Sequence, residues 1–383
     1  MTGIRDTTPC TAILVHGTWG RGFVPKPYDR AAPRWFEPGA PFRDRLVAAL
    51  ARHGSPAPKF VEHHWSGRNS IAERDAAGAG LADLIRNIRA ADPAERIVLI
   101  GHSHGGNILL RAMARLGPEA RGIEMATLAT PFVELLPNAF YFRDNVIVTV
   151  GAILLLSGFA LMTGIWTGPN WALSGALCLV TAAFAWRTLA GGMDSKRIER
   201  AERRSTALVE MTRHPRLDGS DGALLVVRGV DDEASLTLAA GAIVARLSNF
   251  LDRALWPFVI GAIVVFSLFP LVHILSMSID SLSGLYGVIE PYRGLATGAV
   301  VALGAIFFLA NLCVTVAPAG YGRELFLHSA DIEINAQSVP DGVNAMVRTL
   351  ARGTTQDPRL RHSIYDEPDC AEIIARWLHQ RRK

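Results

Sequence analysis

Four long stretches without a charged residue restrict the fold more than any other feature of the chain. They span 146–166, 171–186, 255–279 and 295–318. As an α-helix the first stretch would extend about 31 Å, which matches a bilayer hydrocarbon core of about 30 Å. A buried core helix explains any one stretch, but soluble cores rarely need four of this length. Because the stretches form two close pairs, we predict two transmembrane helical hairpins, at 146–186 and 255–318.

Two hairpins would leave the polar sequence on one side of the bilayer. The polar segments are 1–145, 187–254 and 319–383, and they hold every Lys and Arg except Arg293. Positively charged flanks favour the cytoplasmic side of a membrane. We therefore expect a multi-pass integral membrane protein with one cytoplasmic domain built from these three segments. The first residues contain no long apolar stretch, so we expect no cleavable signal peptide.

The polar segments alternate between strand-like and helix-like sequence. The strand-like runs are 11–17, 59–65, 96–102, 123–130, 223–229 and 331–338. The helix-like runs are 41–54, 71–91, 107–117 and 368–383, with a basic helix at 194–214. Near-continuous apolar strands between helices are typical of a parallel sheet covered on both faces. The sequence predicts an α/β domain with a mainly parallel sheet.

Charge and cysteine content argue against several classes of partner. The formal charge is only +4, from 39 Lys and Arg against 35 Asp and Glu. The chain has no basic stripe with interleaved aromatic residues, so we expect no nucleic acid partner. The four cysteines lie far apart and form no CxxC pair, which argues against a disulfide framework or a zinc site. We expect neither a metal nor an organic cofactor.

A glycine-rich segment, VLIGHSHGGNIL (98–109), joins a strand-like run to a helix-like run. Gly101, Ser103 and Gly105 match the pattern G-x-S-x-G, in which a serine on a strained turn projects its hydroxyl into the open as a nucleophile. The alternative is a strand-to-helix turn without chemistry. The apolar strand before Ser103 and the helix after it favour the nucleophile.

An upstream segment, ILVHGTWG (13–20), is a candidate for the site that stabilises an oxyanion. His16 and Gly17 end the first strand-like run, and the turn after them can present the backbone N–H of Thr18 or Trp19. The backbone N–H of His104 would be the second donor. A simple strand-ending turn is the alternative interpretation.

An acid and a base complete the candidate set. The strand-like run 223–229 leads into Asp231 and Asp232, either of which can orient a catalytic histidine. Helix N-capping by Asp232 is the competing role, and Glu134 is a more remote candidate acid. His362 lies after the last strand-like run and before the final helix, where the mechanism needs its base.

In this order, the residues resemble the α/β-hydrolase superfamily, on its lipase and esterase side. The resemblance implies a mainly parallel sheet of roughly eight strands and a triad in which Ser103 is the nucleophile, His362 the general base and acid, and Asp232 the residue that orients His362. The sequence DEAS, which opens a helix, favours Asp232 over Asp231. The two hydrophobic hairpins depart from the family, because they interrupt the catalytic domain.

The function predicted from these residues is that of a membrane-embedded serine hydrolase. It would cleave an ester or thioester through an acyl-enzyme. The membrane location favours a lipid or acylated substrate, and a soluble small ester is the alternative. A hydrolase fold kept for membrane binding or scaffolding, without catalysis, is the alternative. A transporter is less favoured, because the four apolar stretches contain no Asp, Glu, Lys or Arg to mark an ion route.

Overall fold

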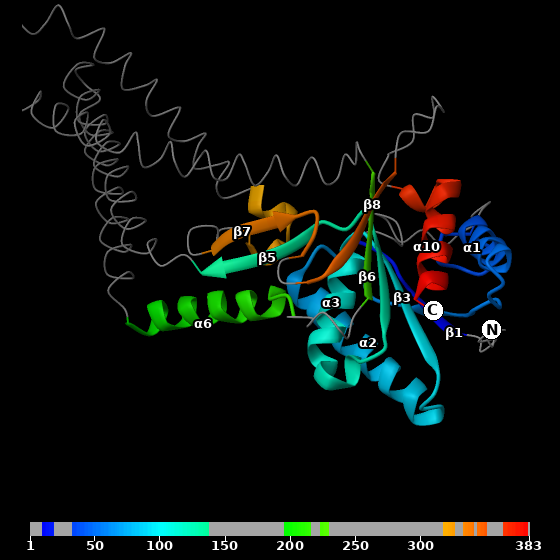
Figure 1. Cartoon of the computed structure of the whole chain (residues 1–383). Helices are drawn as coiled ribbons and strands as arrows, with labels where there is room; N and C mark the ends of the chain where they lie inside the picture. Colours follow the sequence, from blue (N-terminus) through cyan, green and yellow to red (C-terminus); the bar gives the residue numbers. More distant parts are fainter. Residues whose placement is uncertain are drawn as a thin grey trace, which may run out of the picture.

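A parallel six-stranded sheet organises the part of the chain that the structure, a computed structural model, describes. The described residues are 10–18, 33–137, 195–215, 223–229, 317–325, 332–340, 343–350 and 363–381. The strand order is β2-β1-β3-β4-β6-β8, and every neighbouring pair is parallel (Figure 1). The strands are β1 (Cys10–Val15), β2 (Lys59–His63), β3 (Arg96–His102), β4 (Glu124–Leu128), β6 (Ala223–Gly229) and β8 (Ala345–Leu350). The prediction of an α/β domain with a mainly parallel sheet is confirmed.

Helices cover both faces of this sheet. Helices α1 (Pro41–Arg52) and α10 (Pro368–Gln380) pack on one face, and α2 (Ile71–Ala91) and α3 (His104–Leu116) pack on the other. Side chains along a strand alternate between the two faces. In β3, Val98 and Ile100 join the core under α1 and α10, whereas Ile97 and Leu99 join the core under α2 and α3. Burial on both faces explains why the strand-like runs are apolar almost without interruption.

A smaller module lies beside the sheet. Its strands β5 (Phe132–Pro137) and β7 (Ile332–Gln337) pair antiparallel, and α6 (Ser195–Thr212) packs against them. The short helix η5 (Arg323–Leu325) contributes to the core of this module, and η4 (Ala317–Gly320) contacts η5. Its core contains Leu135, Leu208, Tyr321, Leu325 and Ile334.

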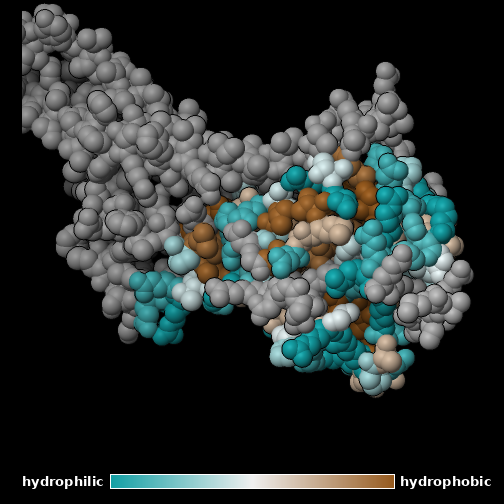
Figure 2. Space-filling model, in the orientation of Figure 1, coloured by the Kyte–Doolittle hydropathy of each residue, from teal (hydrophilic) through white to brown (hydrophobic). Residues whose placement is uncertain are grey.

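The first half of α6 carries polar side chains at the surface. Glu199, Arg200, Glu202, Arg203 and Arg204 are exposed, and this end of α6 is hydrophilic in Figure 2. The second half anchors the helix, because Leu208 is buried and the Thr212 hydroxyl accepts a hydrogen bond of 3.0 Å from the Leu135 N–H. The prediction of a basic helix with a solvated face fits this arrangement.

The sheet differs from the sequence prediction at its edges. The strand-like run 331–338 was expected in the parallel sheet, but it forms β7 of the antiparallel pair. Two strands, β5 and β8, were not predicted. Strand β8 takes the edge beside β6, and the side chains of Arg348 and Thr349 are exposed there, so its sequence lacks the apolar run that marks a central strand.

The predicted membrane hairpins lie outside the described residues, apart from Ala317 and Pro318 at the end of the last apolar stretch. None of the helices within the described ranges combines the length and the apolar character that a membrane crossing requires. The hairpins and the domain boundaries drawn from them stay predictions.

Candidate active site

Ser103 is the single residue between β3 and α3. Its backbone adopts φ 54° and ψ −133°, a region that residues with side chains rarely occupy. The Ser103 N–H donates to the Leu128 carbonyl of β4 over 2.8 Å, and the Ser103 carbonyl accepts from the Gly106 N–H over 3.0 Å. Such strain persists only where the surroundings fix it, and it concentrates at functional sites. Ser103 thus lies on a strained strand-to-helix turn.

The glycines beside Ser103 allow α3 to approach the sheet closely. A Cβ on Gly101 would lie 2.8 Å from the backbone carbon of Gly105, and a Cβ on Gly105 would lie 2.4 Å from the Val15 carbonyl oxygen. Both distances are shorter than a real Cβ tolerates, and both involve backbone atoms that cannot rotate away. The elbow therefore needs glycine at 101 and 105 for packing against β3 and β1.

The turn after β1 lies directly against the serine side chain. A Cβ on Gly17 would lie 2.6 Å from the Ser103 Cβ and 3.2 Å from its Oγ. Ser103 is only 9% exposed. The turn after β1 thus packs against the Ser103 side chain, and the sequence prediction that the hydroxyl stands clear of the sheet stays a prediction.

His16 is packed between two aromatic rings. Its imidazole, which is fully buried, stacks on Phe36 at 4.9 Å and on Trp65 at 5.5 Å between ring centroids. The Trp65 Nε1–H donates to the His16 carbonyl over 2.8 Å. The His16 Nδ1 lies 2.9 Å from the Gly17 carbonyl oxygen. No sequence pattern predicts the two stacked rings, which come from distant segments.

His104 begins α3, so its backbone N–H belongs to the helix N-terminus. The first N–H groups of an α-helix have no acceptor within the helix, and the dipole there favours negative charge. The His104 imidazole is 6% exposed, and its Nδ1 lies 3.3 Å from the Asn107 amide nitrogen. Asn107 itself donates to the Pro131 carbonyl over 2.8 Å. This placement suits the backbone role proposed for His104.

Thr18 follows Gly17 and has a buried hydroxyl. Its Oγ1 finds no hydrogen-bond partner within the described part of the chain. A buried hydroxyl without a partner is costly, by about 1–3 kcal/mol, and such a group in a native structure calls for an explanation. Because Thr18 follows Gly17, this hydroxyl lies in the turn that contacts Ser103.

Four predicted site residues lie outside the described residues: Trp19, Asp231, Asp232 and His362. The strands that lead to three of them are described. Strand β6 ends at Gly229, before the two aspartates, and Gly229 is in register with Leu350 at the end of β8, the strand before His362. Because all six strands are parallel, these ends share one edge of the sheet with Ser103. Glu134 instead lies within β5, opposite Asn335 of the antiparallel pair.

The segment that follows His362 packs beside the elbow. Helix η6 (Ile364–Asp366) carries Tyr365, whose ring lies 4.8 Å from the ring of His102 and stacks on Trp35 at 5.4 Å. Burial raises the pKa of Tyr365 above its usual value, although a hydrogen bond with Ser363 opposes the shift. The described chain after residue 362 therefore contacts the residue that precedes Ser103.

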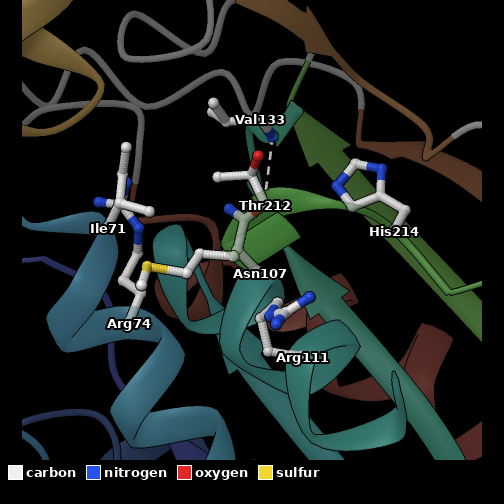
Figure 3. A pocket seen from close by; sticks show the side chains of 8 residues that line it. Ile71, Arg74, Asn107, Arg111, Val133, Thr212 and His214 are labelled. Atoms are coloured by element: carbon white, nitrogen blue, oxygen red, sulfur yellow. Dashed lines mark hydrogen bonds between the residues drawn. The ribbon is translucent and has the colours of Figure 1, made fainter. Parts of the chain in front are cut away.

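A separate small cavity is lined in part by Asn107 and Arg111 of α3 and does not include Ser103. Its volume is about 20 Å³, room for a single water. Figure 3 shows the cavity between α2, α3 and β5; it is lined by Ile71, Arg74, Asn107, Arg111, Val133, Met211, Thr212 and His214. Arg74 donates to the Tyr321 carbonyl, and Arg111 pairs with Asp75 at 2.6 Å. Burial lowers the pKa of Arg74 to about 10. Both arginines already bind groups of the protein, so we do not assign the cavity a ligand.

Within the described ranges, no group of His, Cys, Asp and Glu side chains is arranged to hold a metal ion. The chemistry that this part of the chain offers is that of a serine hydroxyl beside backbone N–H donors. A serine on such a turn can act as a nucleophile towards a carbonyl carbon once a base accepts its proton.

Comparison with known proteins does not establish a family. No family model matches the chain, and no curated protein matches it. Among solved structures, the chain is similar to an extracellular α/β-hydrolase from a Paenibacillus species, described as sharing structural and functional homology with tobacco salicylic acid binding protein 2. The sequence identity is 18% and the TM-score is 0.20, over 32% of this chain and 41% of that chain. The match spans less than half of that protein and is too weak to assign a function.

Proposed function

We propose that this chain is a serine hydrolase that cleaves a carboxylic ester or thioester through an acyl-enzyme on Ser103. One observation supports this most strongly. Ser103 holds a strained backbone conformation between β3 and α3, at the sheet edge where Gly17 packs against its side chain. Strain of this kind at the carboxyl edge of a parallel sheet is typical of a site, not of a connecting turn.

The proposed reaction uses residues that follow strands β1, β3, β6 and β8 in the sequence. The Ser103 Oγ attacks the carbonyl carbon while His362 accepts its proton, and Asp232 (Asp231 is the alternative) orients His362. The backbone N–H of His104 and that of Thr18 or Trp19 stabilise the negative charge that develops on the carbonyl oxygen. His362 then protonates the leaving alcohol or thiol, and water releases the acyl group by the same steps.

The proposed substrate is a lipid or another acylated molecule at a membrane. The four apolar stretches support this location, because each pair is long enough in sequence for a hairpin that enters the bilayer. The positive flanks support a cytoplasmic catalytic domain. A bilayer would then deliver an acyl substrate to the same side as Ser103.

The second candidate is a hydrolase fold that binds or scaffolds at the membrane without catalysis. The burial of Ser103, which is only 9% exposed, favours this candidate. A substrate needs access to the hydroxyl for turnover, and little of Ser103 is exposed. The two candidates differ in whether the hydroxyl reacts.

Labelling with a fluorophosphonate probe separates them. Membranes carrying the full chain are treated with the probe, and the parent is compared with Ser103→Ala. A matched control is Ser55→Ala, because Ser55 is also buried but lies in the loop between α1 and β2. We expect labelling of the parent and of Ser55→Ala, and none of Ser103→Ala. An inserted parent that takes no label would favour the non-catalytic candidate.

Cysteine labelling tests the proposed topology separately. Single cysteines placed at 167–170 and at 280–294 should react with an impermeant thiol reagent from outside the cell. A cysteine near residue 210, in α6, should react only after the membrane is opened. The reverse pattern would overturn the cytoplasmic placement without affecting the proposed chemistry of Ser103.

A further inference from the structure

Two side chains fix the backbone of the turn that touches Ser103. The first is Trp65, which follows β2, the strand paired with β1. Its indole Nε1–H donates to the His16 carbonyl over 2.8 Å, and the side chain is 6% exposed. The indole N–H can only donate and the His16 carbonyl can only accept, so the direction of this hydrogen bond is fixed.

The second is the imidazole of His16 itself. Its Nδ1 lies 2.9 Å from the Gly17 carbonyl oxygen, and because a carbonyl only accepts, Nδ1 carries the proton in this contact. The ring is held between Phe36, at an interplanar angle of 27°, and Trp65, at 17°. A fully buried ring clamped on both faces has little freedom to turn away from Gly17.

These two hydrogen bonds set the direction of two successive N–H groups. In a trans peptide the C=O and the following N–H point in opposite directions, and the described residues contain no cis peptide. Trp65 holds the His16 carbonyl, so it fixes the Gly17 N–H. His16 holds the Gly17 carbonyl, so it fixes the Thr18 N–H. Both N–H groups belong to the turn that packs against Ser103.

We propose that Trp65 and His16 are positioning residues for the oxyanion-stabilising N–H of Thr18: His16 holds the peptide plane that carries this N–H, and Trp65 holds the plane before it. The proposal rests on the proposed serine hydrolase activity and extends it beyond the nucleophile. Both side chains act through the backbone of the turn. Donors aimed in advance at the site of developing charge stabilise a transition state without reorganising during the reaction. Loss of either hydrogen bond lets a peptide plane of the turn rotate. The N–H donors of the turn are then no longer oriented before the reaction begins.

The test is a substitution that keeps the ring and removes the donor. Trp65→Phe retains an aromatic ring against His16 but lacks the N–H, and His16→Phe does the same for the second hydrogen bond. With detergent-solubilised full chain and p-nitrophenyl butyrate, we expect each change to lower kcat by about tenfold or more while KM stays within twofold. Fluorophosphonate should label Ser103 more slowly in the same proportion.

The control is Trp377→Phe, because Trp377 is also buried, at 3% exposed, but lies on α10 on the opposite face of the sheet. Its kcat should match the parent. A parent labelled at Ser103 with unchanged kcat in Trp65→Phe and His16→Phe overturns the positioning role and leaves the hydrolase proposal standing. A rise in KM alone also overturns it, since that would indicate substrate contact. A parent that takes no label overturns both proposals.

Discussion

Gly17 and Ser103 lie so close that a Cβ on Gly17 would sit 2.6 Å from the Ser103 Cβ. The register of the sheet explains this contact. Val15 of β1 is aligned with Gly101 of β3, so the residues two positions further along each strand meet side by side. The turn after β1 and the elbow after β3 therefore form one unit, in which the absence of a side chain at 17 leaves room for the serine.

Gly17→Ala should disable this unit. The added methyl meets the Ser103 side chain and the His102 carbonyl oxygen, at 2.9 Å, so either the turn or the elbow must move. We expect loss of fluorophosphonate labelling and a destabilisation of about 1–3 kcal/mol, as for other overpacked cores. Thermal unfolding and labelling rate measure the two effects. Gly320→Ala is the control, because a Cβ there would have nothing within 4 Å. An unchanged labelling rate in Gly17→Ala would contradict the close contact between Gly17 and Ser103.

Ser103→Gly should be more stable than Ser103→Ala. Both remove the hydroxyl, but only glycine adopts φ 54° and ψ −133° without steric cost. Relief of this strain is worth about 1–3 kcal/mol, reduced by the greater backbone entropy of glycine in the unfolded chain. Melting temperatures of the two inactive variants check the prediction. Equal stability would mean that the turn relaxes once the hydroxyl is gone.

The elbow was predictable from sequence because its determinants are local. An apolar strand, glycines at 101 and 105, and a following helix lie within one short segment, and the packing at Gly101 and Gly105 accounts for them. The parallel sheet was predictable for a similar reason, since strands buried on both faces are apolar throughout.

The rest of the site depends on contacts that the sequence does not record. Trp65 lies 49 residues from His16 along the chain, and nothing in its neighbourhood indicates that its indole would bond to that carbonyl. The burial of Ser103 likewise depends on the register between β1 and β3. Strand β8 could not be predicted from an apolar run, because this edge strand is partly exposed and carries polar residues such as Arg348.

Gly78 and Gly80 of α2 should respond in opposite ways to alanine. A Cβ on Gly78 would lie 2.5 Å from the Arg111 Cβ on α3, so Gly78→Ala should separate the two helices and destabilise by about 1–3 kcal/mol. A Cβ on Gly80 would meet only the His63 ring, at 3.6 Å. Gly80→Ala should stabilise by up to about 1 kcal/mol through helix propensity. Thermal unfolding of both variants tests the pair, and similar melting temperatures would contradict the close helix packing.

Thr18→Val should raise stability. The Thr18 hydroxyl is buried without a hydrogen-bond partner in the described structure, and valine has nearly the same shape without that polar atom. Removing an unsatisfied buried hydroxyl should add about 1 kcal/mol to the free energy of unfolding. Thr18→Ser, which keeps the hydroxyl, is the matched control and should gain nothing. A lower melting temperature for Thr18→Val would show that the hydroxyl has a partner after all.

Glu324 should make the first turn of α2 sensitive to acid. Its carboxylate accepts hydrogen bonds from the Ser70 hydroxyl, from the Ile71 N–H over 2.9 Å and from the Ala72 N–H over 3.4 Å. Burial alone would raise the pKa of Glu324, but these hydrogen bonds outweigh it and lower the pKa below its usual value. A carboxylate with a lowered pKa stabilises the fold above its unfolded pKa, of about 4.3, and that stability is lost as the pH falls through the folded value.

Hydrogen exchange of the amides of Ile71 and Ala72 measures this effect locally. At pH 7, Glu324→Gln should weaken their protection by about 1 kcal/mol, since a neutral amide accepts these bonds less strongly than a carboxylate. The difference between parent and variant should shrink as the pH falls from about 4.3 through the lowered folded pKa, because the parent carboxyl is neutral below that value as well. Glu210→Gln is the control, because the pair that its carboxylate forms with Arg213 is exposed, and such a pair adds little to stability. A difference that persists undiminished at low pH would show that the charge of Glu324 does not stabilise the helix start.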